Sequence, residues 1–194
     1  SMPGMMDTVL DLGLNEASVE ALARATGNPL FAWDSWHRML EMYGDVVLGV
    51  PRRREGDAPG KAAPPPGTKH DPHAELAELK DRVTRLRERI QAEAGRPVPH
   101  DPHAQLAGAI DAVFRSWMND RAVVYRRRYG IPESWGTAVN VQAMVYGNLG
   151  PGSATGVAFT RDPATGENRF WGEYLMEAQG EDVVAGIRTP RPVE

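Results

Sequence analysis

The chain has no cysteine among its 194 residues. This absence excludes a disulfide framework, a thiolate zinc site and a cysteine nucleophile, and we expect a reducing compartment. Long apolar runs are also missing: nothing approaches about 18 consecutive apolar residues, and no basic segment followed by an apolar one opens the chain. The sequence therefore predicts neither a membrane-spanning helix nor a signal peptide, and we expect a cytoplasmic location.

An excess of charge of one sign is lacking as well. The 22 Lys and Arg residues against 26 Asp and Glu leave a formal net charge of −4, and 41% of the residues are hydrophobic. This balance is typical of a soluble globular protein and gives no general attraction to nucleic acid or to a membrane. A Pro-rich interruption within the chain argues for more than one packing unit.

Four regions follow from the shifts in composition. We divide the chain into residues 1–50 (an opening loop and two helices), 51–70 (a Pro- and Gly-rich linker or mobile loop), 71–130 (a helical hairpin) and 131–194 (a β-rich unit). The predicted fold class is α+β, with the helices preceding a mostly antiparallel sheet.

Helix signals are frequent in the first two thirds of the chain. Asn15 predicts the start of a helix that ends at about Thr26, before Gly27. Asp34 predicts the start of a second helix that ends before Gly44. Each predicted helix has a cap, an apolar face and a stop.

A repeat, His-Asp-Pro-His-Ala, occupies residues 70–74 and 100–104. Asp at the N-cap with Pro in the first turn predicts two helix starts, for helices that cover about 71–94 and 102–129. Metal binding by the four histidines is the weaker interpretation, because no cysteine and no fixed acidic ligand accompanies them.

Beyond Pro132 the pattern changes from helical to extended. Residues 137–146 are β-branched and apolar, and a turn cluster follows them. Further strands are predicted at about 156–161, 169–177 and 181–188. These predicted strands would form the sheet of the β-rich unit.

Acidic and amide side chains lie beside glycines in this last region. If the strand is extended, Glu173 and Glu177 face the same side, with Gln179 and Glu181 after a turn. Oxygen donors of this kind suit Mg²⁺, which needs one or two carboxylates in addition to phosphate oxygens. The alternative is an acidic face that only contacts solvent.

Six sequence blocks together carry a resemblance to a known family. They are SMPGMMDTVL at 1–10, FAWDS at 31–35, AVFRSW at 112–117, GTAVNVQ at 136–142, GVAFTR at 156–161, and the stretch from GE at 172–173 to RTP at 188–190. In this order they resemble the ATP-grasp nucleotide-binding domain of pyruvate, phosphate dikinases over nearly the whole chain. The Pro-rich segment 51–69 is the main departure from the family.

The resemblance implies a phosphotransferase that uses ATP and Mg²⁺. In the family, the nucleotide domain phosphorylates a histidine on a separate carrier domain, and a barrel domain binds pyruvate on the way to phosphoenolpyruvate. We expect neither of those partner domains in this chain, nor the start of the nucleotide domain, which supplies an ATP-binding lysine and an arginine. The chain is thus expected to be an internal fragment, inactive alone, of an enzyme that forms a homo-oligomer.

The resemblance also implies roles for individual residues. Gly4 and Thr8 belong to the phosphate-covering loop, and Arg188 balances charge on the transferred phosphoryl group. Asp162 is expected mainly in a structural turn, with metal binding as the weaker alternative. The remaining expected site residues are Gln142 and Met144 at the adenine, Gln179 at the cofactor, and Glu173 and Glu181 at magnesium.

Other functions remain open at this point. Phosphoenolpyruvate synthases and related antibiotic phosphotransferases share the nucleotide domain, although QGED at 179–182 and TP at 189–190 favour the dikinases. A different class is a non-catalytic fragment whose helices at 71–94 and 102–129 only pack against another protein.

Overall fold

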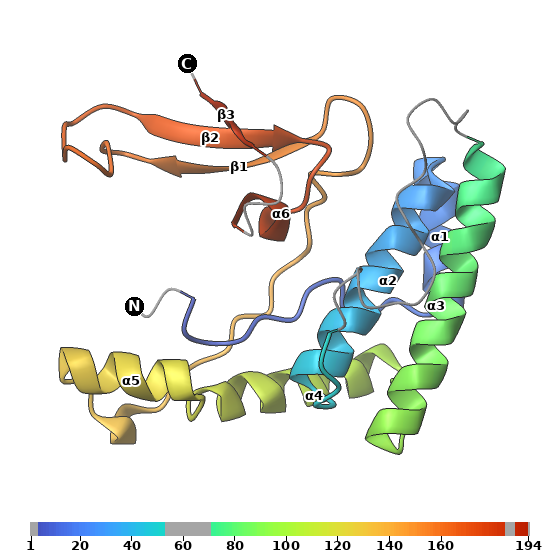
Figure 1. The fold of residues 1–194 in the computed structure, drawn as a ribbon, viewed down its shortest axis with the longest axis horizontal. Coiled ribbons are helices and arrows are strands. Elements are labelled where there is room, and N and C mark those ends of the chain that lie inside the picture. Colours follow the sequence, from blue (N-terminus) through green and yellow to red (C-terminus); the bar gives the residue numbers. More distant parts are fainter. Residues whose placement is uncertain (1–3, 53–70, 185–188, 194) are drawn as a thin grey trace.

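The computed structural model describes residues 4–52, 71–184 and 189–193. The fold is α+β, as predicted, with helices first and an antiparallel sheet last (Figure 1). Its elements are α1 (Glu16–Thr26), α2 (Pro29–Val46), α3 (Pro72–Ala94), α4 (Pro102–Ser116), α5 (Asp120–Tyr129), the 3-10 helix η1 (Glu133–Trp135), β1 (Ala154–Phe159), β2 (Trp171–Met176), α6 (Gly180–Val184) and β3 (Arg191–Pro192). Within the described part of the chain, no helix is both long and apolar enough to cross a membrane.

The main core lies among α1, α2 and α3, with α4 closing one end. Its apolar members are almost completely buried and include Val19, Trp36, Met39, Leu40, Tyr43, Val83 and Ile90. The helices α2 and α3 approach closely where α2 carries Gly44: a Cβ atom there would lie 3.1 Å from Cδ1 of Ile90. A small residue at this contact allows the two helices to pack side by side.

Local capping signals explain where most helices begin. The prediction for α1 is confirmed: the side chain of Asn15 accepts hydrogen bonds from the backbone N–H groups of Ala17 and Ser18, and Gly27 follows the helix with φ 66°. Asp71 and Asp101 cap α3 and α4 as predicted, each followed by Pro in the first turn. These contacts join residues only a few positions apart, which is why the sequence reveals them.

Both predicted bounds of α2 are wrong, since the helix starts before Asp34 and continues through Gly44 to Val46. The helix begins at Pro29, and the side chain of Asn28 accepts a hydrogen bond from the N–H of Phe31 at 3.1 Å. Asp34 lies inside the helix, where its carboxylate accepts a hydrogen bond from Nε of Arg38 at 2.8 Å. Both Asn28 and Asp34 are residue types that cap helices, and Pro29 selects the earlier one.

The predicted single helix over 102–129 is also wrong, because the chain turns between α4 and α5. The N–H of Met118 donates to the carbonyl of Arg115 at 2.9 Å, which tightens the end of α4. Asn119 then adopts an extended backbone, with φ −61° and ψ 146°, and α5 starts at Asp120. The apolar spacing continues across this break, so periodicity alone did not indicate it.

The sheet has three antiparallel strands in the order β1-β2-β3. In register, Val157 lies opposite Glu173, and Glu173 lies opposite Pro192. The predicted strands at 156–161 and 169–177 are confirmed with shifted bounds. Residues 137–146 are extended, but they belong to no strand of this sheet in the described structure.

The predicted strand at 181–188 is wrong over residues 181–184, which form α6, and residues 185–188 lie outside the described residues. At the start of α6, the carboxylate of Asp182 accepts a hydrogen bond from the backbone N–H of Gln179 at 2.8 Å. This contact satisfies a backbone donor at the first turn, as an N-terminal capping interaction does.

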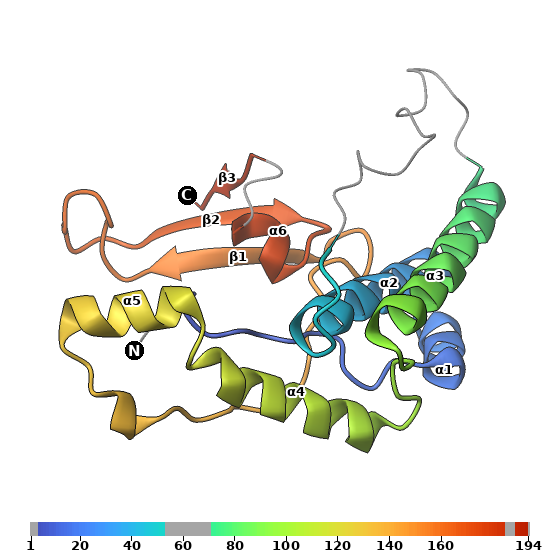
Figure 2. The same cartoon turned by 60° about the horizontal axis from the view of Figure 1, so that its bottom comes forward.

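The elements form two arms that extend from the α1–α3 helices in the same direction. One arm is the sheet with α6, the other is the run of α4 and α5, and the N-terminal segment lies between them in both views (Figures 1 and 2). The arrangement places the N-terminal loop beside segments that lie more than a hundred residues away in the sequence.

Candidate functional site

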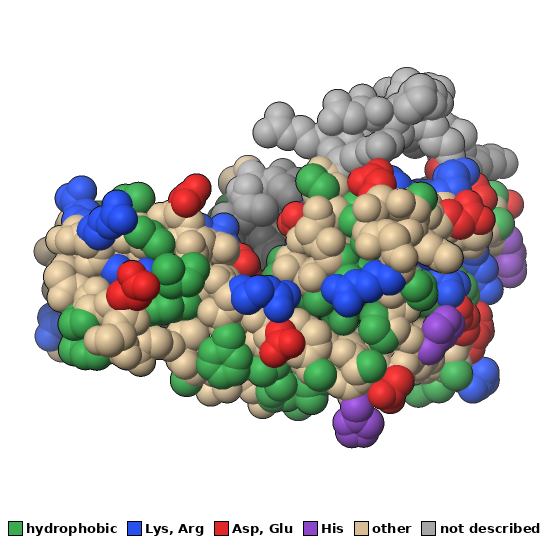
Figure 3. Space-filling model, turned by 90° about the horizontal axis from the view of Figure 1, so that it is seen from below, with side chains coloured by type: hydrophobic (Ala, Val, Ile, Leu, Met, Phe, Trp, Pro, Cys, Tyr) green, Lys and Arg blue, Asp and Glu red, His purple; other side chains and the backbone are tan. Residues whose placement is uncertain are grey.

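An apolar groove of about 390 Å³ lies between three segments of the chain: the N-terminal segment at 9–13, helix α4 and the extended segment 139–144. Its lining is largely aliphatic and includes Val9, Leu12, Leu106, Ile110, Val113, Val139, Val141 and Met144. The lining residue Val141 remains 68% exposed, and Phe114 next to the lining residue Val113 is 49% exposed. Hydrophobic side chains are visible across this face of the molecule (Figure 3).

The groove is lined by the two residues that the sequence predicted at the adenine. Gln142 and Met144, expected at the adenine, both line it. Gly4 and Thr8, expected at the phosphates, are exposed and do not line it, although Thr8 directly precedes the lining residue Val9. The loop that contains Gly4 and Thr8 therefore leads directly into the part of the N-terminal segment that lines the groove.

Gln105 of α4 holds the N-terminal segment against this groove. It is 1% exposed, and its Oε1 accepts a hydrogen bond from the N–H of Gly13 at 2.8 Å. Its Nε2 donates to the carbonyls of Leu14 at 3.1 Å and Pro99 at 2.8 Å. The sequence analysis missed Gln105, because a lone glutamine in a helix is usually exposed and nothing local reveals its partners.

Asp11 and Tyr146 connect the groove to helix α2. Asp11 is buried in the left-handed conformation, with φ 58°, and lies beside the hydroxyl of Tyr146. Burial raises the pKa of Tyr146 to about 12, and the negative charge of Asp11 adds to this shift. The ring of Tyr146 packs edge-on against Phe31, with centroids 4.9 Å apart, so the end of the extended segment is fixed to α2.

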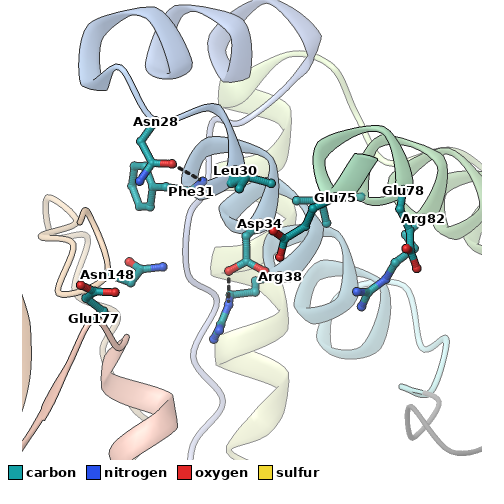
Figure 4. Close-up of a pocket in the computed structure, with 11 residues that line it drawn as sticks. Asn28, Leu30, Phe31, Asp34, Arg38, Glu75, Glu78, Arg82, Asn148 and Glu177 are labelled. Atoms are coloured by element: carbon teal, nitrogen blue, oxygen red, sulfur yellow. Dashed lines mark hydrogen bonds and ion pairs between the residues drawn. The ribbon is translucent and has the colours of Figure 1, made fainter. Parts of the chain in front are cut away.

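A second, charged cleft of about 510 Å³ lies between α2, α3 and the turn near Asn148 (Figure 4). Nε of Arg38 donates to Asp34 at 2.8 Å, and a second guanidinium nitrogen donates to Asp182 of α6 at 2.9 Å. Burial lowers the pKa of Arg38, but the carboxylates of Asp34 and Asp182 outweigh that effect and raise it overall. These ion pairs join the sheet arm to the helices.

Of the two expected magnesium ligands, only Glu173 has a described side chain. Glu173 is on β2 and lines neither cavity. The prediction that Glu173 and Glu177 share a face fails, because Glu177 has φ 49° beyond the end of β2 and lines the charged cleft. The side chain of Glu181 and the whole of Arg188 lie outside the described residues.

Gln179 is buried without a described partner for its side-chain amide. Its side chain is buried, with 1% exposure of the residue, yet neither Oε1 nor Nε2 has a hydrogen-bond partner among the described residues. Burying an amide without partners is unfavourable, so such a group commonly indicates a ligand, a water or a functional role. The cofactor role predicted for Gln179 is compatible with this environment.

Two weaker metal hypotheses find structural explanations. Asp162 accepts hydrogen bonds from the N–H groups of Ala164 at 2.8 Å and Thr165 at 3.1 Å, and it pairs with Arg169. These contacts, the Arg169 hydrogen bond first, lower the pKa of Asp162 and close the turn between β1 and β2. From the second histidine repeat, His100 pairs with Glu16 at 2.9 Å. Among the described residues, no group of three or more His, Asp and Glu side chains could hold a metal ion.

Comparison with known proteins gives consistent matches over the whole chain. The family described as "Pyruvate phosphate dikinase, AMP/ATP-binding domain" matches residues 1–193. The chain is 55% identical to "Pyruvate, phosphate dikinase" of Rhizobium meliloti over 193 residues and 52% identical to the protein of that name from Clostridium symbiosum over 195 residues. It is 48% identical over 194 residues to "Pyruvate, phosphate dikinase 1, chloroplastic" of Arabidopsis thaliana. All of the chain is covered in each match, but only 22%, 22% and 20% of these relatives.

Proposed function

The chain belongs to the pyruvate phosphate dikinase AMP/ATP-binding domain family, and from this premise we propose that it binds ATP with the adenine base in the apolar groove. The observation that carries the proposal is the presence of Gln142 and Met144 in one groove with residues 9–13, which continue the N-terminal loop. A base bound in the groove would therefore lie beside the segment that leads to the loop proposed for the phosphates.

The groove suits a purine in size and in chemistry. Small-molecule sites have volumes of roughly 300–1,000 Å³ and apolar walls with a few polar groups that fix orientation. Here aliphatic side chains supply the walls, and the Gln142 amide supplies a donor and an acceptor. The backbone of 139–144 joins no strand of the described sheet, so its N–H and C=O groups can pair with the edge of the base.

The phosphates would extend from the groove toward Gly4 and Thr8. Gly4 has φ 71° and open space where a Cβ would be, which allows its backbone to approach a phosphate closely. Magnesium, when bound, neutralises charge on the phosphoryl oxygens, and Glu173 and Glu181 would hold it. Gln179 would contact the bound cofactor, and Arg188 would balance the transferred phosphoryl group.

The complete reaction would belong to a longer protein. The chain spans 20–22% of the length of the relatives named above, so carrier histidine and pyruvate sites would lie in other domains. We therefore propose an ATP-grasp unit of a cytoplasmic, homo-oligomeric phosphotransferase that phosphorylates a carrier histidine on the way to phosphoenolpyruvate, with no turnover by this chain alone.

Calorimetric titration with MgATP tests the groove. We expect binding by the wild-type chain, and a Kd about fivefold weaker for Gln142→Ala, since one hydrogen bond contributes about 1 kcal/mol. Gln91→Ala, at an exposed position on α3, is the matched control and should bind like the wild type. Unchanged affinity in Gln142→Ala would reject the groove. No binding by the wild type would favour the non-catalytic helical fragment.

Titration of Glu173→Ala and Glu181→Ala with ATP tests the magnesium hypothesis separately. Both variants should lose the part of the ATP affinity that depends on added Mg²⁺ and keep the part measured without it. Equal magnesium dependence in the wild type and in both variants would remove these two carboxylates from the site.

A further inference from the structure

The junction between α4 and α5 holds the N-terminal loop through several side chains. The N–H of Asp7 donates to Oγ of Ser116 at 3.0 Å, and Nδ2 of Asn119 donates to Oδ2 of Asp7 at 2.9 Å. The guanidinium of Arg121 pairs with the other carboxylate oxygen of Asp7, and its Nε donates to the carbonyl of Met5 at 3.1 Å. We name Ser116, Asn119 and Arg121 the junction cradle. It binds the loop at its backbone and at both oxygens of one carboxylate.

The side chain of Asn119 binds Asp7 and does not cap the helix that Asn119 precedes. It occupies the N-cap position of α5 but makes no side-chain capping hydrogen bond there. A capping side chain typically contributes about 1 kcal/mol to a helix, and α5 forgoes this contribution while Asn119 contacts Asp7. Ser116 is equally committed: it is 1% exposed, and its hydroxyl donates to the carbonyl of Val113 at 2.7 Å while accepting from Asp7.

The cradle rests on a rigid support. The guanidinium of Arg126 lies 4.1 Å from the ring centroid of Trp117 and donates to the carbonyl of the same residue. The indole nitrogen of Trp117 donates to the carbonyl of Glu133 at 3.0 Å. Trp117 lies between the cradle residues Ser116 and Asn119, so these contacts fix the turn on which the cradle is built.

We propose that the junction cradle positions the loop at residues 4–6 for the phosphates of the nucleotide. This inference rests on the proposed function, because it assigns to Ser116, Asn119 and Arg121 a role exerted through Asp7 on that loop. None of the cradle residues lines the groove itself, although Ser116 donates to the backbone carbonyl of the lining residue Val113. They act on the orientation of the loop backbone, and therefore on phosphate binding more than on base binding.

Loop position can be measured without any nucleotide. Because the chain has no cysteine, a spin label on Thr8→Cys reports on one position only. Asn119→Asp is close to isosteric and preserves a capping residue, but it places a carboxylate against Asp7; Arg121→Gln removes the ion pair. We expect a more mobile spectrum in both variants. Arg128→Gln, on the same helix, is the matched control and should leave the spectrum unchanged. Equal mobility in all four proteins would overturn the proposal.

Nucleotide affinity separates positioning from general stability. We expect MgATP to bind at least about fivefold more weakly to Asn119→Asp and Arg121→Gln, while adenosine, which has no phosphates, binds as it does to the wild type. The double variant Asp7→Asn with Asn119→Asp exchanges donor and acceptor and should recover part of the loss. Circular dichroism would verify that each variant is folded.

The two proposals fail in different ways. If the wild type binds neither MgATP nor adenosine, the proposed function is refuted, and the nucleotide role of the cradle is refuted with it. If the wild type binds MgATP but both cradle variants bind it equally well, only the positioning role is refuted. A loss that affects adenosine and MgATP to the same extent would also refute it, because a positioning defect acts through the phosphates.

Discussion

Replacement of Gln105 by Leu gives the sharpest test of how the groove is built. Leu fills nearly the same volume but provides no polar atoms, so the N–H of Gly13 and the carbonyls of Leu14 and Pro99 lose their partner. Leaving a buried polar group without a hydrogen bond costs about 1–3 kcal/mol.

Burial decides how much of that cost remains. Only the contact with the Leu14 carbonyl is fully buried, whereas the contacts with Gly13 and Pro99 are partly buried and can be replaced by water. We therefore expect the free energy of unfolding to fall by about 2–4 kcal/mol in Gln105→Leu. This loss corresponds to one or two buried polar groups left without a hydrogen bond, and not to all three. The N-terminal segment should also detach from α4 more readily.

Urea unfolding followed by circular dichroism measures this loss. The urea concentration at the midpoint of unfolding should fall. The slope of the unfolding free energy against urea concentration should stay constant, since the surface exposed on unfolding hardly changes. Gln91→Leu makes the same substitution at an exposed position of α3 and should change stability by less than about 0.5 kcal/mol. If the two variants are equally stable, Gln105 does not hold the segment and the description of the groove is wrong.

Further predictions concern the turns and the titrating groups around the site. The pKa of Tyr146, raised from 10.0 to about 12, predicts a contribution to stability that is fully present below about pH 10 and is lost as the pH rises to about 12; Tyr146→Phe should flatten this loss in alkaline unfolding curves, and an unchanged curve would contradict it. The lowered pKa of Asp162 predicts the opposite dependence: its contribution is present above the ordinary aspartate pKa and is lost as the pH falls through the lowered value. In Asp162→Ala, hydrogen exchange should accelerate at the amides of 164 and 165, and unchanged protection there would rule out the turn contacts. Gly147→Ala would place a Cβ 2.4 Å from the carbonyl oxygen of Ala178, so we expect a loss of about 3 kcal/mol in thermal unfolding; a stable variant would show that the two backbones do not approach as described.

Local signals were sufficient to predict most helix ends. Asn15, Asp71 and Asp101 cap their helices through backbone N–H groups two or three residues away, so the sequence contains both partners of each contact. The same signals were ambiguous where two capping residues compete, as Asn28 and Asp34 do. Competition of this kind is decided by packing and by the fixed backbone of proline.

Strand predictions depended on partners that the sequence does not specify. The strands predicted at 156–161 and 169–177 form, with shifted bounds, because these consecutive segments pair with each other. The segment 137–146 has similar β-branched composition but joins no strand in the described structure, and 181–184 forms a helix instead. Strand propensity describes how well a residue type suits a sheet. A segment with high propensity becomes a strand only where a neighbouring strand pairs with it.

The family, the α+β class and the caps of α1, α3 and α4 follow from the amino-acid sequence alone. Three features required the folded chain: Gln142 and Met144 share a groove with the N-terminal segment, Gln105 binds this segment, and Asn119 contacts Asp7 instead of capping its own helix. The physical reason is the separation of the partners: Gly13 and Gln105 are 92 positions apart, and Asp7 and Asn119 are 112 apart. Contacts over such distances form only when the complete chain has packed, so no local pattern encodes them.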